Sequence, residues 1–385
     1  MLASHSMSDL TPLPRPHLAS FTAYHPGKPI HEVQRELGLT DVIKLASNEN
    51  ALGASPRAKM AILESLDEIA TYPDTACVSL RQALSRQLDV KVENIVVGNG
   101  AVELIYYLCQ SYLQPGDDVI TGQPSFSAYY IASRIQDARV IKVPLTQHRF
   151  DLDGLLAALT PRTRLVFIAN PNNPTGTIRT TAELRTFIGQ VPENVLVILD
   201  EAYHEFVTDP AYQGAVRLVD EFPNVAVLRS LSKTIGIAGL RVGYGIARPE
   251  VVATLDQVQV PFHVNLLAQR AAAAAIEDSA FIERTLAMLA EGRRFLYREL
   301  ERLGVEFVPT HANFVFVGVR CPAREMFERL LAQGVIVRPC DGFDAPEHIR
   351  VTIGLPEQNA RFIRALERCL PGGTPASGPG AKRLA

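Results

Sequence analysis

Seven short apolar runs, separated by segments with helical periodicity, constrain the fold of this chain more than any other feature. The runs read NIVVG, DDVIT, ARVIKVP, RLVFIAN, VLVILD, NVAVLRS and VGYGIA, and each is flanked by Gly, Pro, Asn or Asp. Such runs are typical of strands that are buried on both faces. Strands that alternate with helices predict an α/β fold, in which a mostly parallel seven-stranded sheet is sandwiched by helices over residues 75–262.

A smaller α+β domain is predicted from the rest of the chain. Residues 265–304 are rich in Ala, Leu, Glu and Arg, which predicts two helices that meet near EDSA. Short strands are then predicted at VEFVP, NFVFVGV, VIVRPC and HIRVTIG. We therefore predict an N-terminal arm over residues 1–30, a discontinuous small domain over 31–74 and 263–371, a large domain over 75–262, and a flexible tail over 372–385.

Composition excludes several classes of protein. The net charge of −3 and the absence of a dense Lys/Arg block argue against a nucleic-acid partner. No apolar run approaches the roughly 18 residues of a membrane helix, and the first residues lack the apolar core of a signal peptide. Five scattered cysteines without C-x-x-C spacing predict no metal site and a reduced, cytoplasmic protein. Either Met1 or Met7 could be the functional start.

Ligands of parallel sheets bind at the carboxyl ends of the strands, so the residues that follow each apolar run are the candidates for a site. NIVVG is followed by Asn99-Gly100-Ala101, which opens a helix whose N-terminus suits an anion such as phosphate. RLVFIAN is followed by a turn that contains Asn172 and Asn173. Both features are also compatible with ordinary turn chemistry.

The run VLVILD ends at Asp200, with Tyr203 three residues further on. A carboxylate at the end of a buried strand is costly unless a cation or a hydrogen-bond donor meets it. A helix N-cap is the alternative interpretation of Asp200.

The next strand delivers Lys233, and Arg241 follows eight residues later. A Walker-type phosphate loop is excluded because VLRSLSK lacks the required glycines. A solvated lysine at a helix start and a surface arginine are the simpler interpretations.

One molecule requires all of these groups together, and that molecule is pyridoxal 5'-phosphate. Asp200 would face its ring nitrogen and keep it protonated, and Tyr203 and Asn173 would donate hydrogen bonds to its ring oxygen. Lys233 would attach it covalently and carry a proton during catalysis. Its phosphate would be held by Arg241, Ser230 and Ser232 and by the backbone at Gly100, Ala101 and Val102.

The motifs NPNNPTGT, LDEAYHEF and SLSKTIGIAGLRVGYG resemble those of the fold-type I pyridoxal-phosphate aminotransferases. YHPGKPI, KLASNEN and TYPD resemble the histidinol-phosphate aminotransferase subgroup. The resemblance extends from about Tyr24 to Cys369. It departs from the subgroup at Ala51, where proline is usual, and at Val102, where an acidic residue is common.

The resemblance implies further residues and a homodimer with its active site at the subunit interface. Tyr72 would reach the cofactor phosphate of the neighbouring subunit, and Phe126 would stack on the cofactor ring. Arg350 would bind the acidic end of the substrate, Arg338 would bind substrate phosphate, and Tyr24 would close over the substrate.

The predicted reaction is transamination between L-histidinol phosphate and 2-oxoglutarate, in histidine biosynthesis. Three alternatives remain open at this stage. They are an aromatic amino-acid aminotransferase of the same subgroup, a decarboxylase of phosphorylated amino acids, and a non-catalytic module that senses the cofactor.

Overall fold

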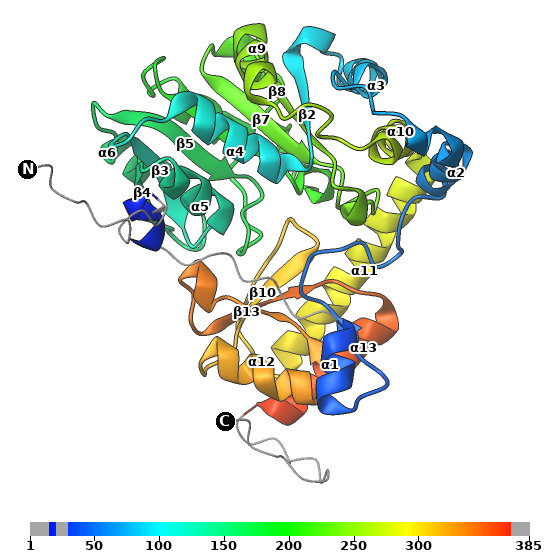
Figure 1. Cartoon of the computed structure of the whole chain (residues 1–385). Helices are drawn as coiled ribbons and strands as arrows, with labels where there is room; N and C mark the ends of the chain where they lie inside the picture. Colours follow the sequence, from blue (N-terminus) through cyan, green and yellow to red (C-terminus); the bar gives the residue numbers. More distant parts are fainter. Residues whose placement is uncertain (1–14, 21–29, 371–385) are drawn as a thin grey trace, which may run out of the picture.

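The structure is a computed structural model that describes residues 15–20 and 30–370, and it contains a large sheet domain beside a smaller domain (Figure 1). The large sheet has seven strands in the order β2-β8-β7-β6-β5-β3-β4. Their bounds are β2 Ile95–Gly98, β3 Asp118–Gln123, β4 Arg139–Pro144, β5 Thr163–Ala169, β6 Leu196–Asp200, β7 Val225–Ser230 and β8 Gly243–Ala247. Each predicted apolar run forms one of these strands, so the predicted α/β fold is confirmed.

The sheet is parallel except at β8, which lies antiparallel to both β2 and β7. The central strands are buried, β6 along its whole length and β7 as far as Arg229, because helices pack against the sheet. That burial explains why their sequences are continuous apolar runs and do not alternate with polar residues. β5, β6 and β7 are parallel neighbours, so their carboxyl ends lie at one edge of the sheet.

Helices accompany the large sheet, and their starts are encoded locally. Thr180 and Glu183 form a reciprocal capping box at the start of α7, and Asp151 caps α6. The helices that pack around this sheet are α2 Pro56–Glu64, α3 Val78–Leu88, α4 Ala101–Tyr112, α5 Ser127–Ile135, α6 Leu152–Ala157, α7 Thr181–Ile188, α8 Leu218–Glu221, α9 Pro249–Val258 and α10 Leu266–Ala275. Short 3-10 turns lie at η2 Pro16–Ser20, η3 Leu66–Ala70, η4 Val92–Asn94, η5 His204–Phe206 and η6 Ala238–Leu240.

The smaller domain has its own apolar core around a four-stranded antiparallel sheet of order β12-β13-β10-β9. The predicted single strand VIVRPC divides into β11 and β12, and β11 pairs in parallel with β1 in a separate two-stranded sheet. The elements are α1 Ile30–Leu37, β1 Ile43–Lys44, β9 Phe307–Val308, β10 Phe314–Gly318, α12 Ala323–Ala332, β11 Val335–Ile336, β12 Arg338–Pro339, η7 Asp341–Phe343, β13 His348–Thr352 and α13 Pro356–Cys369.

The long helix α11, Ser279–Arg302, runs from the large domain into the small one (Figure 1). Two helices were predicted over residues 265–304, and α10 and α11 confirm them, with their junction at EDSA. Asp278 caps α11 and accepts a hydrogen bond of 2.6 Å from Ser55, which itself caps α2. This contact ties the start of α2 to the start of the connecting helix.

The N-terminal segment contributes to both halves of the molecule. α1 and β1 pack on the small domain, whereas Ala58 of α2 belongs to the same apolar core as the large sheet. The domain boundaries that we drew at residues 74 and 262 stay a prediction. The predicted arm lies largely, and the predicted tail wholly, outside the described residues.

None of the helices in residues 15–20 and 30–370 has the length and apolar character needed to cross a membrane. The same part of the chain holds no group of three or more His, Cys, Asp or Glu side chains arranged to bind a metal ion.

Candidate active site

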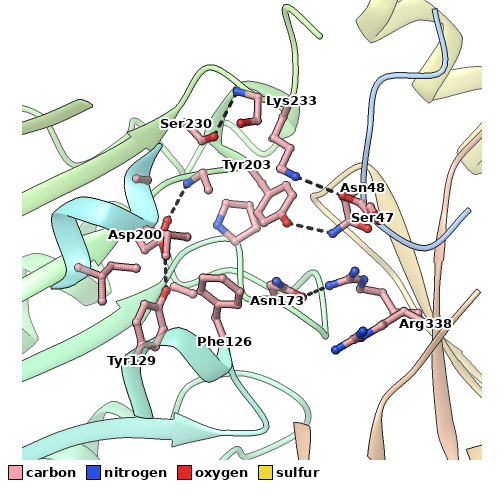
Figure 2. Close-up of a pocket in the computed structure, with 18 of the residues that line it drawn as sticks. Ser47, Asn48, Phe126, Tyr129, Asn173, Asp200, Tyr203, Ser230, Lys233 and Arg338 are labelled. Carbon is pink, nitrogen blue, oxygen red and sulfur yellow. Dashed lines mark hydrogen bonds between the residues drawn. The ribbon is translucent and has the colours of Figure 1, made fainter. Parts of the chain in front are cut away.

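A cavity of about 210 Å³ lies between the two domains at the carboxyl edge of the large sheet (Figure 2). Residues from both domains line it, although they are far apart in the sequence. The predicted site residues that line it are Ala101, Val102, Phe126, Asn173, Asp200, Tyr203, Ser230, Ser232, Lys233, Arg241, Arg338 and Arg350. The structure therefore brings most of the predicted site residues into one pocket.

Asp200 is the last residue of β6 and is buried. One carboxylate oxygen accepts a hydrogen bond of 2.6 Å from the Tyr129 hydroxyl, and the other accepts one of 3.0 Å from the Ala202 amide. Burial raises the pKa of Asp200, while these two hydrogen bonds act in the opposite direction. A carboxylate that is desolvated but kept in place by donors is suited to pair with a cation in the pocket.

Lys233 extends into the pocket from the loop after β7 (Figure 2). Its Nζ lies 3.4 Å from the Ser47 carbonyl oxygen and 5.6 Å from the centre of the Tyr203 ring. Burial, followed by the charges of Arg350 and Arg241, lowers the pKa of Lys233 to about 8. A lysine amine with this pKa has a far larger neutral fraction near physiological pH than an ordinary lysine, and the neutral amine can act as a nucleophile or as a general base.

Tyr203 joins the two domains within the site. Its hydroxyl oxygen accepts a hydrogen bond of 2.9 Å from the side-chain amide of Asn48, and its ring packs edge-on against Phe314 of β10. Asn48 is itself fixed, because Thr352 of β13 accepts a hydrogen bond of 2.9 Å from the Asn48 backbone amide. Asn48 thus holds the Tyr203 hydroxyl in place at the wall of the cavity.

Arg241 and its neighbours form a cationic corner at the start of α4. Arg241 has a left-handed backbone, with φ of +58°, and its guanidinium lies 3.4 Å from the Ser232 hydroxyl. Gly100, which also has positive φ, precedes α4, and a Cβ at this position would lie 2.4 Å from the Arg241 guanidinium. The absence of that Cβ allows the arginine to approach the free amides at the helix N-terminus. This arrangement suits a phosphate group.

The small domain contributes two arginines from adjacent strands. Arg338 of β12 and Arg350 of β13 are register partners, and both line the cavity. Arg350 is buried; it donates hydrogen bonds of 2.6 Å to the side-chain oxygen of Asn173 and 2.7 Å to the Ala46 carbonyl. Its guanidinium also lies over the Phe314 and Phe343 rings. Two adjacent guanidiniums at this wall suit an acidic substrate.

Aromatic residues form a further wall of the cavity. Phe126 packs edge-on against Tyr129, with ring centres 5.6 Å apart, and Tyr129 is stacked on Phe167 in the interior. Phe126 therefore presents an apolar surface to the cavity, and Phe343 of the small domain contributes another. These surfaces suit a flat, apolar ring.

Of the predicted site residues that the structure describes, Gly100 and Tyr72 do not line this pocket, although Gly100 lies against Arg241, which does. The Tyr72 ring is 80% exposed and stacks on Phe262, with ring centres 4.5 Å apart. Tyr24 lies outside the described residues.

Phe343 and three residues that contact other groups of the site were not predicted from the sequence. Tyr129 holds Asp200, Asn48 holds Tyr203, and Ser47 accepts from Lys233. Tyr129 lies in the first turn of α5, three residues after the N-cap Phe126, and the buried Asp200 required a donor, so a tyrosine close to a predicted site residue was a usable signal. The sequence carried no comparable signal for Asn48, whose role depends on a left-handed backbone with φ of +55°.

Comparison with known proteins identifies the family. Residues 40–366 match the family described as "Aminotransferase class I and II". The chain belongs to this family. A histidinol-phosphate aminotransferase of Moorella thermoacetica is 50% identical over 92% of both chains, and one of Anaeromyxobacter sp. is 47% identical over 93% of this chain and 99% of its own. The predicted resemblance to aminotransferases is therefore confirmed.

A solved structure shares the fold of this aminotransferase-family chain. It is the histidinol-phosphate aminotransferase of Sinorhizobium meliloti in complex with pyridoxal-5'-phosphate, which has a TM-score of 0.86 and 27% identity, and the match covers 94% of this chain and 99% of that one. The cavity described above fits the same group. It offers a desolvated lysine amine, a buried carboxylate, an aromatic wall, and the cationic corner at Arg241, which a Cβ at Gly100 would fill.

The depressed pKa of Lys233 leads to a pH-dependence that can be measured. Since its pKa falls from 10.5 to about 8 on folding, the amine becomes reactive as the pH rises through about 8. The unfolded chain binds more protons than the folded chain between these values, so this residue makes stability rise with pH in that window. Reductive methylation of the cofactor-free protein, followed by peptide mapping, should give a midpoint near 8 for Lys233.

An Nα-acetyl-lysine standard in the same reaction, with a pKa of about 10.4, corrects for the reagent. Arg350→Met should move the midpoint of Lys233 upward, because it removes a charge that lowers this pKa. A midpoint for Lys233 near that of the standard would contradict the electrostatic description of the site.

Proposed function

We propose that this chain is a pyridoxal-phosphate-dependent aminotransferase that converts L-histidinol phosphate and 2-oxoglutarate to imidazole acetol phosphate and L-glutamate, in histidine biosynthesis. The observation that carries the proposal is the meeting of Lys233, Asp200 and the two arginines Arg338 and Arg350 in one cavity between the domains. Relatives named histidinol-phosphate aminotransferase are up to 50% identical over nearly the whole chain, which supports the choice of substrate.

When bound, the cofactor supplies a protonated ring that accepts the electron pair released at the substrate Cα. Asp200 keeps a negative charge where the ring nitrogen needs it, since Tyr129 and Ala202 hold the carboxylate in place. Lys233 provides the covalent attachment and then moves the proton at the substrate Cα, for which its pKa of about 8 is suited.

The remaining cofactor contacts come from the other side chains of the cavity. Tyr203 and Asn173, which line the cavity, would donate hydrogen bonds to the ring oxygen, and Phe126 would supply an apolar surface for the ring. Arg241 neutralises the phosphate. Ser230, Ser232 and the backbone at Gly100, Ala101 and Val102 complete its hydrogen bonds.

The small domain provides the two arginines that bind the substrate in this proposal. Arg350 is held by Asn173 and the Ala46 carbonyl, so its guanidinium is oriented before substrate arrives. Together with Arg338 it offers the positive charge that a phosphate requires in one half-reaction and a carboxylate in the other. We also assign substrate closure to Tyr24, on the resemblance of the N-terminal motif alone.

The active protein is a homodimer in this proposal, and Tyr72 serves the partner's site. Tyr72 is exposed beside Phe262, and large apolar side chains that are likewise exposed lie along α2 and η3, at Met60, Leu63, Leu66 and Ile69. An apolar surface of this kind is typical of an interface. We place the protein in the cytoplasm, where its five free cysteines would stay reduced.

A panel of amine donors tests the reaction and the substrate together. With 2-oxoglutarate as the acceptor, kcat/KM should be highest for L-histidinol phosphate. Arg350→Ala should raise the KM for acidic substrates by about 10- to 100-fold, because it removes a charge-assisted hydrogen bond, while the cofactor spectrum stays nearly unchanged.

Other outcomes of the panel identify the alternatives. A higher kcat/KM for phenylalanine or tyrosine would indicate an aromatic amino-acid aminotransferase. Release of CO₂ would indicate a decarboxylase, and binding of the cofactor without any spectral change on adding glutamate would indicate a sensing module.

Mixed dimers test the role of Tyr72. We expect Lys233→Ala to be inactive and Tyr72→Ala to be impaired as separate proteins. A dimer that contains one chain of each variant holds one complete site out of two. Refolding the variants together at equal ratio makes about half of the dimers mixed, so about a quarter of wild-type activity should return. Activity no higher than that of Tyr72→Ala alone would show that Tyr72 does not act across the interface.

A further inference from the structure

A second buried carboxylate lies directly beside Asp200. Glu201 is fully buried and does not line the cavity, whereas its neighbours Asp200 and Ala202 do. One of its oxygens accepts hydrogen bonds of 3.0 and 2.8 Å from Nε and Nη2 of Arg229, and the other accepts one of 2.6 Å from the Tyr212 hydroxyl. The strand end thus carries two consecutive carboxylates, one inside the cavity and one behind it.

Arg229 occupies the corresponding position on the adjacent strand. It is 7% exposed on β7, immediately before Ser230, which lines the cavity. Besides Glu201, the charged and titratable groups that act on Arg229 or feel its charge are His204, Glu205, Tyr212 and Tyr244. Arg229 is therefore the cation of a polar cluster that lies behind the cavity.

Two of the other groups in this cluster have pKa values that burial shifts toward the neutral form. Burial lowers the pKa of His204 well below its ordinary value, and it raises the pKa of Glu205, which accepts a hydrogen bond from Thr234. The buried ion pair behind the strand end is the one between Glu201 and Arg229, whose closest atoms lie 2.8 Å apart.

The charge of Glu201 acts on Asp200 directly. Of the groups around Asp200, Tyr129 and the Ala202 amide donate hydrogen bonds, Lys233 attracts, and Glu201 repels. Repulsion between adjacent desolvated carboxylates favours a proton on one of them. Arg229 is the group that cancels this repulsion, because it meets Glu201 with two N–H donors in the interior.

We infer that Arg229 is a positioning residue for catalysis: by neutralising Glu201, it keeps the shared proton on the cofactor ring nitrogen and leaves Asp200 as the carboxylate. The inference rests on the proposed function, because it concerns the proton on that ring. Without Arg229, Glu201 would be an unpaired negative charge next to Asp200. Because Asp200 lies nearer to it than the cofactor ring would, this charge would destabilise the Asp200 carboxylate more than it stabilises the protonated ring. The ring would then lose its proton to Asp200 and accept electrons less well.

Packing alone does not explain a charged pair at this place. Burying two charges carries a desolvation penalty, and apolar side chains of similar volume are often equally stabilising when they replace a buried pair. A structural role and an electrostatic role therefore make different predictions for a variant in which both charges are removed.

The test uses the enzyme loaded with ¹⁵N-labelled pyridoxal phosphate, in which the ¹⁵N chemical shift reports protonation of the ring nitrogen. The ring should be protonated in the wild type. Arg229→Met should move the proton equilibrium by about tenfold or more toward the neutral ring, which corresponds to one pKa unit. kcat should fall in parallel.

The double variant Glu201→Gln/Arg229→Met should restore the protonated ring, because it removes both charges. Glu201→Gln alone should also leave the ring protonated. If Arg229→Met does not fold, Arg229→Gln, which can still donate a hydrogen bond to Glu201, replaces it with the same expected shift. Arg185→Met is the matched control, since it makes the same change in an exposed pair with Glu221, and it should have no effect on the ring.

Two results would overturn the inference. One is a protonated ring in Arg229→Met or its replacement, and the other is a neutral ring in the double variant, which would indicate a structural role. Failure of the wild-type protein to bind the cofactor would overturn the proposed function instead, so the two failures can be told apart.

Discussion

The site depends on charges that are held in the protein interior, at one edge of a parallel sheet. A carboxylate at Asp200 and an amine at Lys233 are both desolvated, and neither is held by a simple ion pair with the other. Each is instead fixed by neutral partners, Tyr129 for the carboxylate and the Ser47 carbonyl for the amine. This arrangement leaves both groups available to a ligand, which would complete the electrostatics of the cavity.

The small domain completes the same site through hydrogen bonds that cross between the domains. Asn48 holds Tyr203, and Arg350 is anchored on Asn173. The residues proposed to bind the cofactor come mainly from the large sheet, while the arginines proposed to bind the substrate come from the small domain. Any motion of one domain against the other therefore changes how the substrate charge is presented to the amine of Lys233.

Most of the fold could be predicted from the sequence, because continuous apolar runs of this length are typical of strands in a sheet that is covered on both faces. The sequence also indicated most of the site, because polar residues at strand ends such as Asp200 must converge at one edge. It could not reveal partners that depend on tertiary contacts, such as Asn48 for Tyr203 or Arg229 for Glu201. It also could not show that VIVRPC divides between two sheets, since a run of six residues does not encode which neighbour each part finds.

The most direct test of the central claim is to locate the covalent attachment. The protein is purified with pyridoxal phosphate, reduced with borohydride, digested, and mapped by mass spectrometry, with Lys233→Ala as the control. If Lys233 attaches the cofactor, a single phosphopyridoxyl label is expected on the peptide that contains Lys233, and no label in the control. A label on another lysine, or an active wild-type enzyme that carries no label at Lys233, would contradict this attachment.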